Sequence, residues 1–169
     1  MNALITRAIG AVTGGPPPRI FTTLARHPRL FRRWLRFAGA LMPGGRLPRA
    51  ETELVILRVA HNCGSDYEWG QHVRLAEKLG LPREDIDRVA AGPAAEGWSA
   101  TDAALLRAAD ELHEAAKISD ETWGLLAESY EERALIEIPM VVGHYTMLAF
   151  VLNSLGVPLD EGLEPLAAP

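Results

Sequence analysis

The segment at residues 132–156 places the strongest constraint on how this chain can fold. Its sequence, ERALIEIPMVVGHYTMLAFVLNSLG, is apolar on nearly every side of a helix. A helix of this kind crosses a protein core or lies at an interface between subunits. Pro139 lies inside the segment and predicts a kink. A monomer of 169 residues would struggle to cover so much apolar surface, so we expect a homo-oligomer.

Glycine and proline residues divide the rest of the chain into shorter helical segments. Within residues 27–45, apolar residues recur near the i, i+3, i+4, i+7 spacing of an amphipathic helix that stops at Pro43, Gly44 and Gly45. Similar breaks and serine N-caps predict helices at 48–64, 65–80, 83–92, 99–117 and 119–130. No alternating strand pattern bounded by turns occurs, so we predict an all-α fold.

The bulk composition fits one globular domain and limits its partners. We divide the chain into an N-terminal segment at 1–26, a helical domain at 27–156 and a C-terminal tail at 157–169. The net charge of −5 argues against nucleic-acid binding. No run of about 18 apolar residues occurs, so no membrane span is expected. Cys63 is the single cysteine, which excludes an intramolecular disulfide and predicts a cytoplasmic location.

Residues 65–72, SDYEWGQH, carry two overlapping patterns. Ser65 and Glu68 have the spacing of a capping box, in which each side chain satisfies a free backbone N–H at a helix start. Glu68 and His72 place a carboxylate and an imidazole one turn apart, a spacing that suits proton transfer. On a helix both fall on the stripe of Leu75 and Leu79, which predicts that they point into the interior.

A second carboxylate lies on the apolar face of the preceding helix. Glu53 shares a stripe with Leu57 and Ala60. Two helices joined by a short turn are expected to pack against each other, so Glu53, Glu68 and His72 would meet in one partly buried pocket. A carboxylate beside His72 would hold the tautomer of the imidazole. These three residues are the candidate catalytic groups.

The remaining candidates would line or border that pocket. They are Ser65, Tyr67, Trp69, Cys63, His144 and Tyr145. A structural role competes for several of them: a helix cap for Ser65, a small buried hydrophobe for Cys63, and core packing for the aromatic residues. Metal binding is a weaker interpretation because no H-E-x-x-H motif or histidine cluster occurs. We therefore predict no metal and no cofactor.

Three stretches carry a resemblance to a known family. They are ELVILRVAHNCGSDYEWGQHVRLAEKLGL at 53–81, the pattern W-S-x-x-D-x-A-L-L-R-A-A-D-E-L-H at 98–113, and GHYTMLAFVLNSLGV at 143–157. Together they resemble the carboxymuconolactone decarboxylase family, whose wider superfamily includes the alkylhydroperoxidase D-like (AhpD-like) proteins. The resemblance covers roughly residues 27–156 and implies a shared all-α fold. It also implies a homo-oligomer, which we expect to be a dimer, trimer or hexamer.

The resemblance distinguishes two chemistries. In the peroxidase arm a glutamate lies twelve residues before the first cysteine of a C-x-x-C, and a histidine lies four residues after the second. Glu53 and His72 match these positions, but Ser65 and Glu68 occupy the two cysteine positions, and Cys63 falls two residues early. A thiol–disulfide cycle therefore cannot run within one chain. The Glu-x-x-x-His form resembles the decarboxylase arm, which acts on a small lactone acid without a cofactor.

We therefore expect a cofactor-free acid–base enzyme of the decarboxylase or lyase type. Its substrate would be a small, anionic lactone or organic acid. His72 would be the general acid or base, Glu68 its orienting partner or a second proton carrier, and Glu53 the group that tunes both. Arg58 or the arginine-rich segment at 19–49 would attract the substrate carboxylate.

Two alternatives remain open at this point. One is an antioxidant peroxidase of the AhpD-like type, which would use Cys63 as a single reactive thiol with an external reductant. The other is a non-catalytic helical oligomer whose polar cluster only supports the fold.

Overall fold

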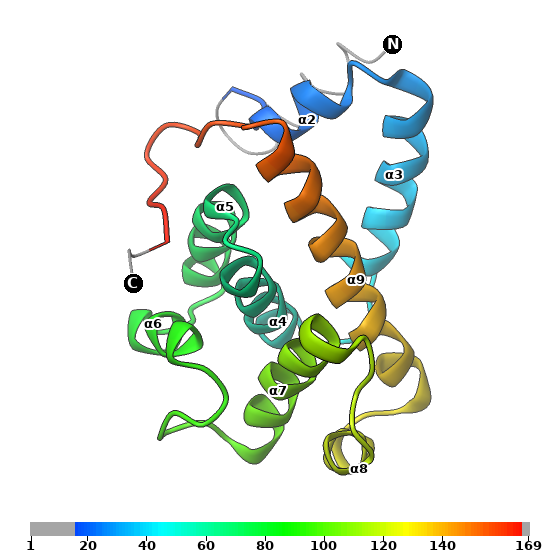
Figure 1. Cartoon of the computed structure of the whole chain (residues 1–169), viewed down its shortest axis with the longest axis vertical. Coiled ribbons are helices and arrows are strands. Elements are labelled where there is room, and N and C mark those ends of the chain that lie inside the picture. Colours follow the sequence, from blue (N-terminus) through cyan, green and yellow to red (C-terminus); the bar gives the residue numbers. More distant parts are fainter. Residues whose placement is uncertain (1–15, 167–169) are drawn as a thin grey trace.

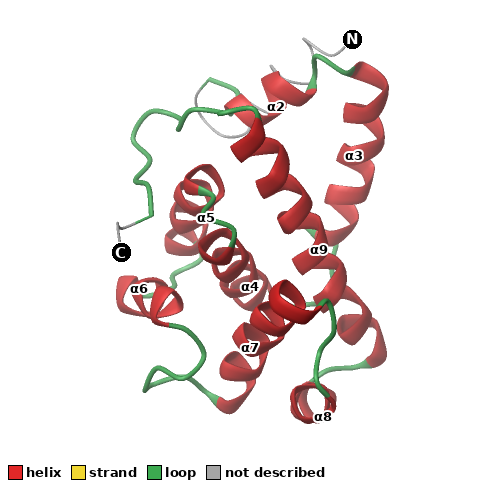
Figure 2. Cartoon of the chain, viewed as in Figure 1, coloured by secondary structure: helices red, strands yellow, loops and turns green. Residues whose placement is uncertain are grey.

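The computed structural model describes residues 16–166, and this part of the chain contains helices and no strand (Figures 1 and 2). The all-α prediction is confirmed. In chain order the helices are α2 (Arg19–Leu24), α3 (Pro28–Leu41), α4 (Arg49–Asn62), α5 (Asp66–Lys78), α6 (Arg83–Ala91), α7 (Ala100–Ala115), α8 (Asp120–Ser129) and α9 (Glu132–Ser154). Most of the expected N-terminal segment lies outside the described residues.

α4 lies at the centre of the fold, with α5, α7 and α9 packed around it (Figure 1). Val55, Ile56, Leu57 and Ala60 on this helix are all fully buried. Burying a large aliphatic side chain stabilises a fold by roughly 1.5–3 kcal/mol, so this helix is held firmly in place. Any polar side chain on α4 that points inward is therefore held in place with it.

Serine caps begin two of the later helices as expected. The Ser99 hydroxyl accepts from the Asp102 backbone N–H at 3.0 Å, and the Ser119 hydroxyl accepts from the Thr122 backbone N–H at 3.2 Å. Each cap satisfies a backbone donor that the helix leaves free and contributes typically about 1 kcal/mol.

α9 crosses the whole molecule, from α8 at one end to α2 at the other (Figure 1). Its buried face includes Ile138, Val142, Leu148 and Leu152, which confirms that the 132–156 segment packs in the core. By length and composition α9 could also cross a membrane. A core helix meets the same criteria, so the absence of a membrane span stays a prediction.

The opposite face of α9 remains apolar and exposed. Ile136, Met140, Met147 and Phe150 recur at helical spacing along it, and Phe150 is 63% exposed. Large contiguous apolar surface of this kind marks contact sites between proteins. If the protein forms a homo-oligomer, this face of α9 is the surface that we expect to lie between subunits.

The segment after α9, expected as a tail, runs along α5 (Figure 1). Gly70 on α5 permits the close approach, because a Cβ there would lie 2.9 Å from the Glu164 carbonyl oxygen and 3.0 Å from Leu163 Cβ. Farther on, the Leu166 N–H donates to Asp66 Oδ1 at 3.1 Å. Residues 157–166 are thus packed against the domain.

We expect light scattering to show that the wild-type protein is an oligomer, with a mass of at least two chains of 18.4 kDa each. Phe150→Glu should shift the population toward the monomer, because a charge in an apolar contact loses its hydration. Leu79→Glu, at an exposed leucine that follows the last residue of α5, is the matched control and should leave the mass unchanged. A wild-type mass of one chain would contradict the prediction.

Candidate active site

Glu53 on α4 and His72 on α5 form a buried pair. Glu53 Oε2 lies 2.6 Å from His72 Nδ1, and the Glu53 side chain is 0% exposed. An ionised carboxylate can only accept, so Nδ1 carries the hydrogen and Nε2 is left as the basic nitrogen. From the surface side, Arg49 Nη2 lies 3.6 Å from the other Glu53 oxygen. The pair therefore sets both the tautomer and the orientation of His72.

Glu68 is buried without a comparable partner. The residue is 3% exposed, and neither carboxyl oxygen has a hydrogen-bond partner among the described residues. Burial raises the pKa of the Glu68 carboxyl from 4.5 to about 8. The Ser65 hydroxyl opposes this shift only in part, and it makes no well-formed hydrogen bond to the carboxyl. Glu68 is therefore mainly protonated at pH 7 and can act as a hydrogen-bond donor.

The capping-box prediction is wrong. Ser65 occupies the N-cap position of α5, but its hydroxyl is buried and accepts no hydrogen bond from the first turn. Glu68 returns no hydrogen bond to the Ser65 backbone either. The expected orientation of His72 by Glu68 is also wrong, because the imidazole is held by Glu53 from the facing helix.

α9 adds His144 and Tyr145 to the site. The Tyr145 ring meets the His72 ring edge-on, at 90° with centroids 5.0 Å apart. His144 Nε2 accepts from Trp34 Nε1 at 2.9 Å, so the neutral imidazole carries its hydrogen on Nδ1, which is buried without a partner. Burial, assisted by nearby His72, lowers the pKa of His144 to about 4. His144 is therefore uncharged at neutral pH.

Glu68, His72, His144 and Tyr145 share the wall of a cavity of about 320 Å³ between α2, α3, α5 and α9. Glu53 lies behind His72 and is not among the lining residues. Most of its lining is apolar or aromatic, including Phe21, Trp34 and Leu148. Besides Trp34, the polar lining residues are Tyr67, Glu68, Gln71, His72, His144 and Tyr145. Its described lining contains no lysine or arginine. The volume and the few polar groups are typical of small-molecule sites.

Three of the expected pocket residues lie away from this cavity. Ser65, Cys63 and Trp69 are not among its lining residues. Trp69 packs instead in a second core cluster around Leu57 and Val73. The thiol sulfur of Cys63 lies 3.9 Å from His113 Nδ1, and burial, with a contribution from Glu68, raises the pKa of the thiol.

Arg58, expected to attract a substrate, is fully engaged elsewhere. It forms two hydrogen bonds to the Asp110 carboxylate, at 2.6 and 3.0 Å. It also donates to the carbonyl oxygens of Val89 and Ala90 at the end of α6. Bidentate pairing of this kind joins α4 to α6 and α7, so Arg58 is a structural residue.

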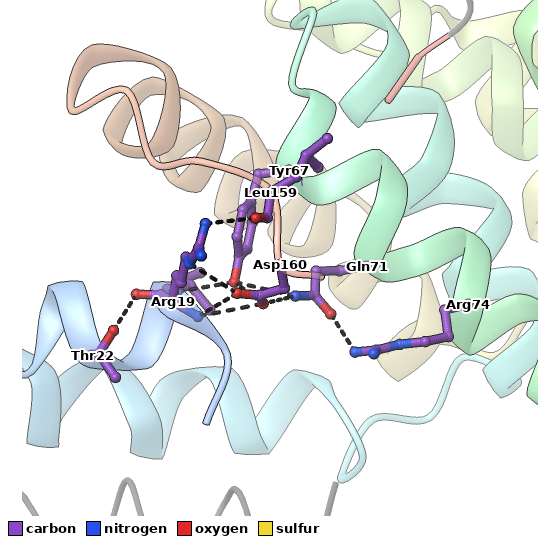
Figure 3. Close-up of polar contacts among 8 residues, drawn as sticks. Arg19, Thr22, Tyr67, Gln71, Arg74, Leu159 and Asp160 are labelled. Atoms are coloured by element: carbon purple, nitrogen blue, oxygen red, sulfur yellow. Dashed lines mark hydrogen bonds and ion pairs between the residues drawn. The ribbon is translucent and has the colours of Figure 1, made fainter. Parts of the chain in front are cut away.

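A polar cluster holds α2 in the cavity wall (Figure 3). The Tyr67 hydroxyl donates to Asp160 Oδ2 at 2.7 Å and accepts from the Ile20 N–H at 3.0 Å. Gln71 also donates to Asp160, and the Arg19 side chain donates to the Leu159 carbonyl oxygen at 2.7 Å. Ile20 and Phe21 then close one side of the cavity. Sequence reasoning missed this role of Gln71 and Asp160, since no local pattern indicates it.

The comparisons with known proteins agree with this architecture. The model of the carboxymuconolactone decarboxylase family matches residues 28–111, which include Glu53, Glu68 and His72. The chain belongs to the superfamily of carboxymuconolactone decarboxylase and AhpD-like proteins. A search of curated protein sequences gives no significant match.

Solved structures with the same fold have low sequence identity to this chain. A peroxidase-related protein from Ralstonia eutropha JMP134, described as an alkylhydroperoxidase AhpD core, is 19% identical with a TM-score of 0.84 over 95% of this chain and 85% of that chain. A peroxidase-related protein from Silicibacter sp. TM1040 is 16% identical with a TM-score of 0.85 over 94% and 84%. The debrominase Bmp8 is 16% identical with a TM-score of 0.78 over 95% and 86%. At these identities the likeness shows the fold.

The raised pKa of Glu68 predicts a pH-dependent stability. The folded chain holds this proton up to about pH 8, whereas the unfolded chain releases it near 4.5, so the free energy of unfolding falls as pH rises between these values. Glu68→Gln should remove this slope, about 1.4 kcal/mol per pH unit. Urea unfolding at pH 5.5 and 7.5 measures it, with exposed Glu121→Gln as the control. Equal pH responses of wild type and Glu68→Gln would contradict the assignment.

Loss of the Asp160 carboxylate should release α2. Asp160→Ala leaves the donors on Tyr67 and Gln71 unpaired and should cost about 1–3 kcal/mol of stability. Backbone amides of α2 should then exchange faster with deuterium. Asp87→Ala, which removes an exposed ion pair with Arg83, is the matched control and should change little. Unchanged exchange in α2 would show that this cluster does not hold the helix.

Proposed function

We propose that this protein is a cofactor-free acid–base enzyme that transfers protons on a small organic molecule. One observation carries the proposal: a histidine held by a carboxylate shares the wall of one apolar cavity with a second, buried carboxyl that has no described hydrogen-bond partner. Burial raises the pKa of this second carboxyl, Glu68, to about 8. Titratable groups whose surroundings push them into different protonation states are the usual sign of an acid and a base working together.

Each of the three residues has a distinct part in this proposal. His72 Nε2 is the base that accepts a proton from the substrate, since Nδ1 already donates to Glu53. Glu53 is a positioning residue that stabilises the imidazolium formed in that step. Glu68 gives its proton to the oxygen on which negative charge develops, and becomes a carboxylate. Return of both protons restores the site, so no oxidant, reductant or metal is required.

The cavity supports proton transfer through its mainly apolar lining. Its apolar wall lowers the local dielectric, and charge–charge and hydrogen-bond interactions are stronger there than in water. A variant of Bmp8 is known in complex with 2,3,4-tribromopyrrole, a small ring compound. That complex supports one part of the proposal, namely that a protein of this fold can bind a small ring compound.

The structure offers less support for the thiol peroxidase. Reactive cysteines carry a lowered pKa, whereas the pKa of Cys63 is raised, and Cys63 does not line the cavity. Loss of carbon dioxide, the reaction named by the family, starts from a carboxylate, for which the described lining provides no cation. We therefore favour proton transfer without loss of carbon dioxide, such as isomerisation, on a lactone or a related carbonyl compound.

Deuterium incorporation from D₂O into a panel of lactones and cyclic ketones, followed by NMR, tests the proposed chemistry directly. His72→Ala should reduce the exchange rate by about 10²–10⁴-fold, the usual contribution of a positioned proton-transfer group. Glu53→Gln should also lower the rate, while Cys63→Ser should leave it unchanged. Hydroperoxide consumption that is lost in Cys63→Ser, with no deuterium exchange in the wild type, would favour the peroxidase instead.

A further inference from the structure

Positive charge is missing from the described wall of the cavity. Arg49 on α4 and Arg74 on α5 already have partners: Arg49 pairs with Glu53, and Arg74 donates to Gln71 Oε1 at 2.7 Å. Neither lines the cavity. A carboxylate that entered would lose its hydration and gain no cation in return, which is strongly unfavourable.

Negative charge is present close to the same wall. Glu53, beside His72, is completely buried, and Glu68 becomes negative whenever it loses its proton. An anionic ligand would add a further negative charge in surroundings of low dielectric, where like charges repel more strongly than in water. The electrostatics therefore favour an uncharged ligand.

The hydrogen-bonding groups of the wall specify which polar atoms the ligand needs. Glu68 and His144 line the cavity, and the protonated Glu68 carboxyl and His144 Nδ1 are donors without a described partner. Both donor groups are themselves buried, so a ligand meets them when the side chains turn toward the cavity. His72 Nε2 is the basic nitrogen and requires a hydrogen from the ligand. A carbonyl oxygen flanked by an acidic C–H supplies both the acceptor and the hydrogen.

The size and the aromatic lining limit the rest of the ligand. At about 30 Å³ for each water-sized group, a cavity of about 320 Å³ holds roughly ten such groups. Phe21 and Trp34 lie with ring centroids 5.8 Å apart on one part of the wall, and Tyr145 lies on another. Flat aromatic surfaces favour a planar ring as their contact.

We infer that the cavity selects an uncharged, single-ring carbonyl compound of this size and rejects the matching carboxylate. This selection rests on the site of the proposed function and differs from the expectation of an anionic substrate.

Binding of a matched pair of probes tests the inference. The compounds 4-fluoroacetophenone and 4-fluorobenzoate have equal numbers of non-hydrogen atoms and differ in charge. Fluorine NMR line broadening at pH 7 should give a dissociation constant at least about tenfold lower for the ketone than for the carboxylate. Equal binding, or tighter binding of the benzoate, would overturn the inference.

Three variants locate the binding. Glu68→Leu removes the donor and should weaken ketone binding by about tenfold, whereas Glu68→Gln keeps an N–H donor and should bind within a few fold of wild type. Ala38→Leu narrows the cavity from the α3 side and should also weaken binding. Circular dichroism and thermal unfolding establish that each variant is folded. Ketone binding that is unchanged in both Glu68→Leu and Ala38→Leu would place the ligand elsewhere and refute the inference.

The binding result and the catalytic result are separable. A preference for the ketone without deuterium exchange would leave the selection intact and refute the acid–base function. Exchange on lactones together with preferred binding of the benzoate would leave the function intact and refute the selection.

Discussion

The placement of Glu53 in the middle of the core governs the rest of the site. α4 is buried along most of its length, so the carboxylate has no route to water and depends on His72 and Arg49 for its partners. Pairing with His72 requires α5 to pack against α4 in a single register. That register in turn carries Glu68 to the same cavity wall. The buried pair is thus a constraint on packing as well as a part of the chemistry.

Helical periodicity could predict the inward faces of both helices before any contact was known. Glu53 lies on the stripe of Leu57 and Ala60, and Glu68 lies on the stripe of His72, because residues three and four apart share one side of a helix. The same rule also placed Leu79 on the inward stripe, and this prediction is wrong, because Leu79 is the C-cap of α5 and is exposed. Periodicity also could not decide which carboxylate reaches Nδ1 of the imidazole, since that depends on the distance between two helices.

Contacts between segments far apart in the sequence account for most of what was missed. Asp160 reaches Tyr67 only because the chain after α9 passes along α5, and Gly70 leaves the room for that passage. Arg58 finds Asp110 across the packing of α4 on α7. None of these pairs has a spacing or a periodicity that a single sequence displays. Each depends on the tertiary arrangement, which local rules do not encode.

The surroundings of Glu68 favour proton transfer over the thiol–disulfide cycle of the peroxidase arm. Ser65 and Glu68 stand where the peroxidase arm of the family carries its two cysteines, and both residues are buried. Burial there raises the pKa of a carboxyl, which makes it a proton donor at neutral pH. The same burial, together with Glu68 itself, raises the pKa of the neighbouring Cys63 thiol and opposes formation of a thiolate. One environment therefore favours proton transfer and disfavours thiol chemistry.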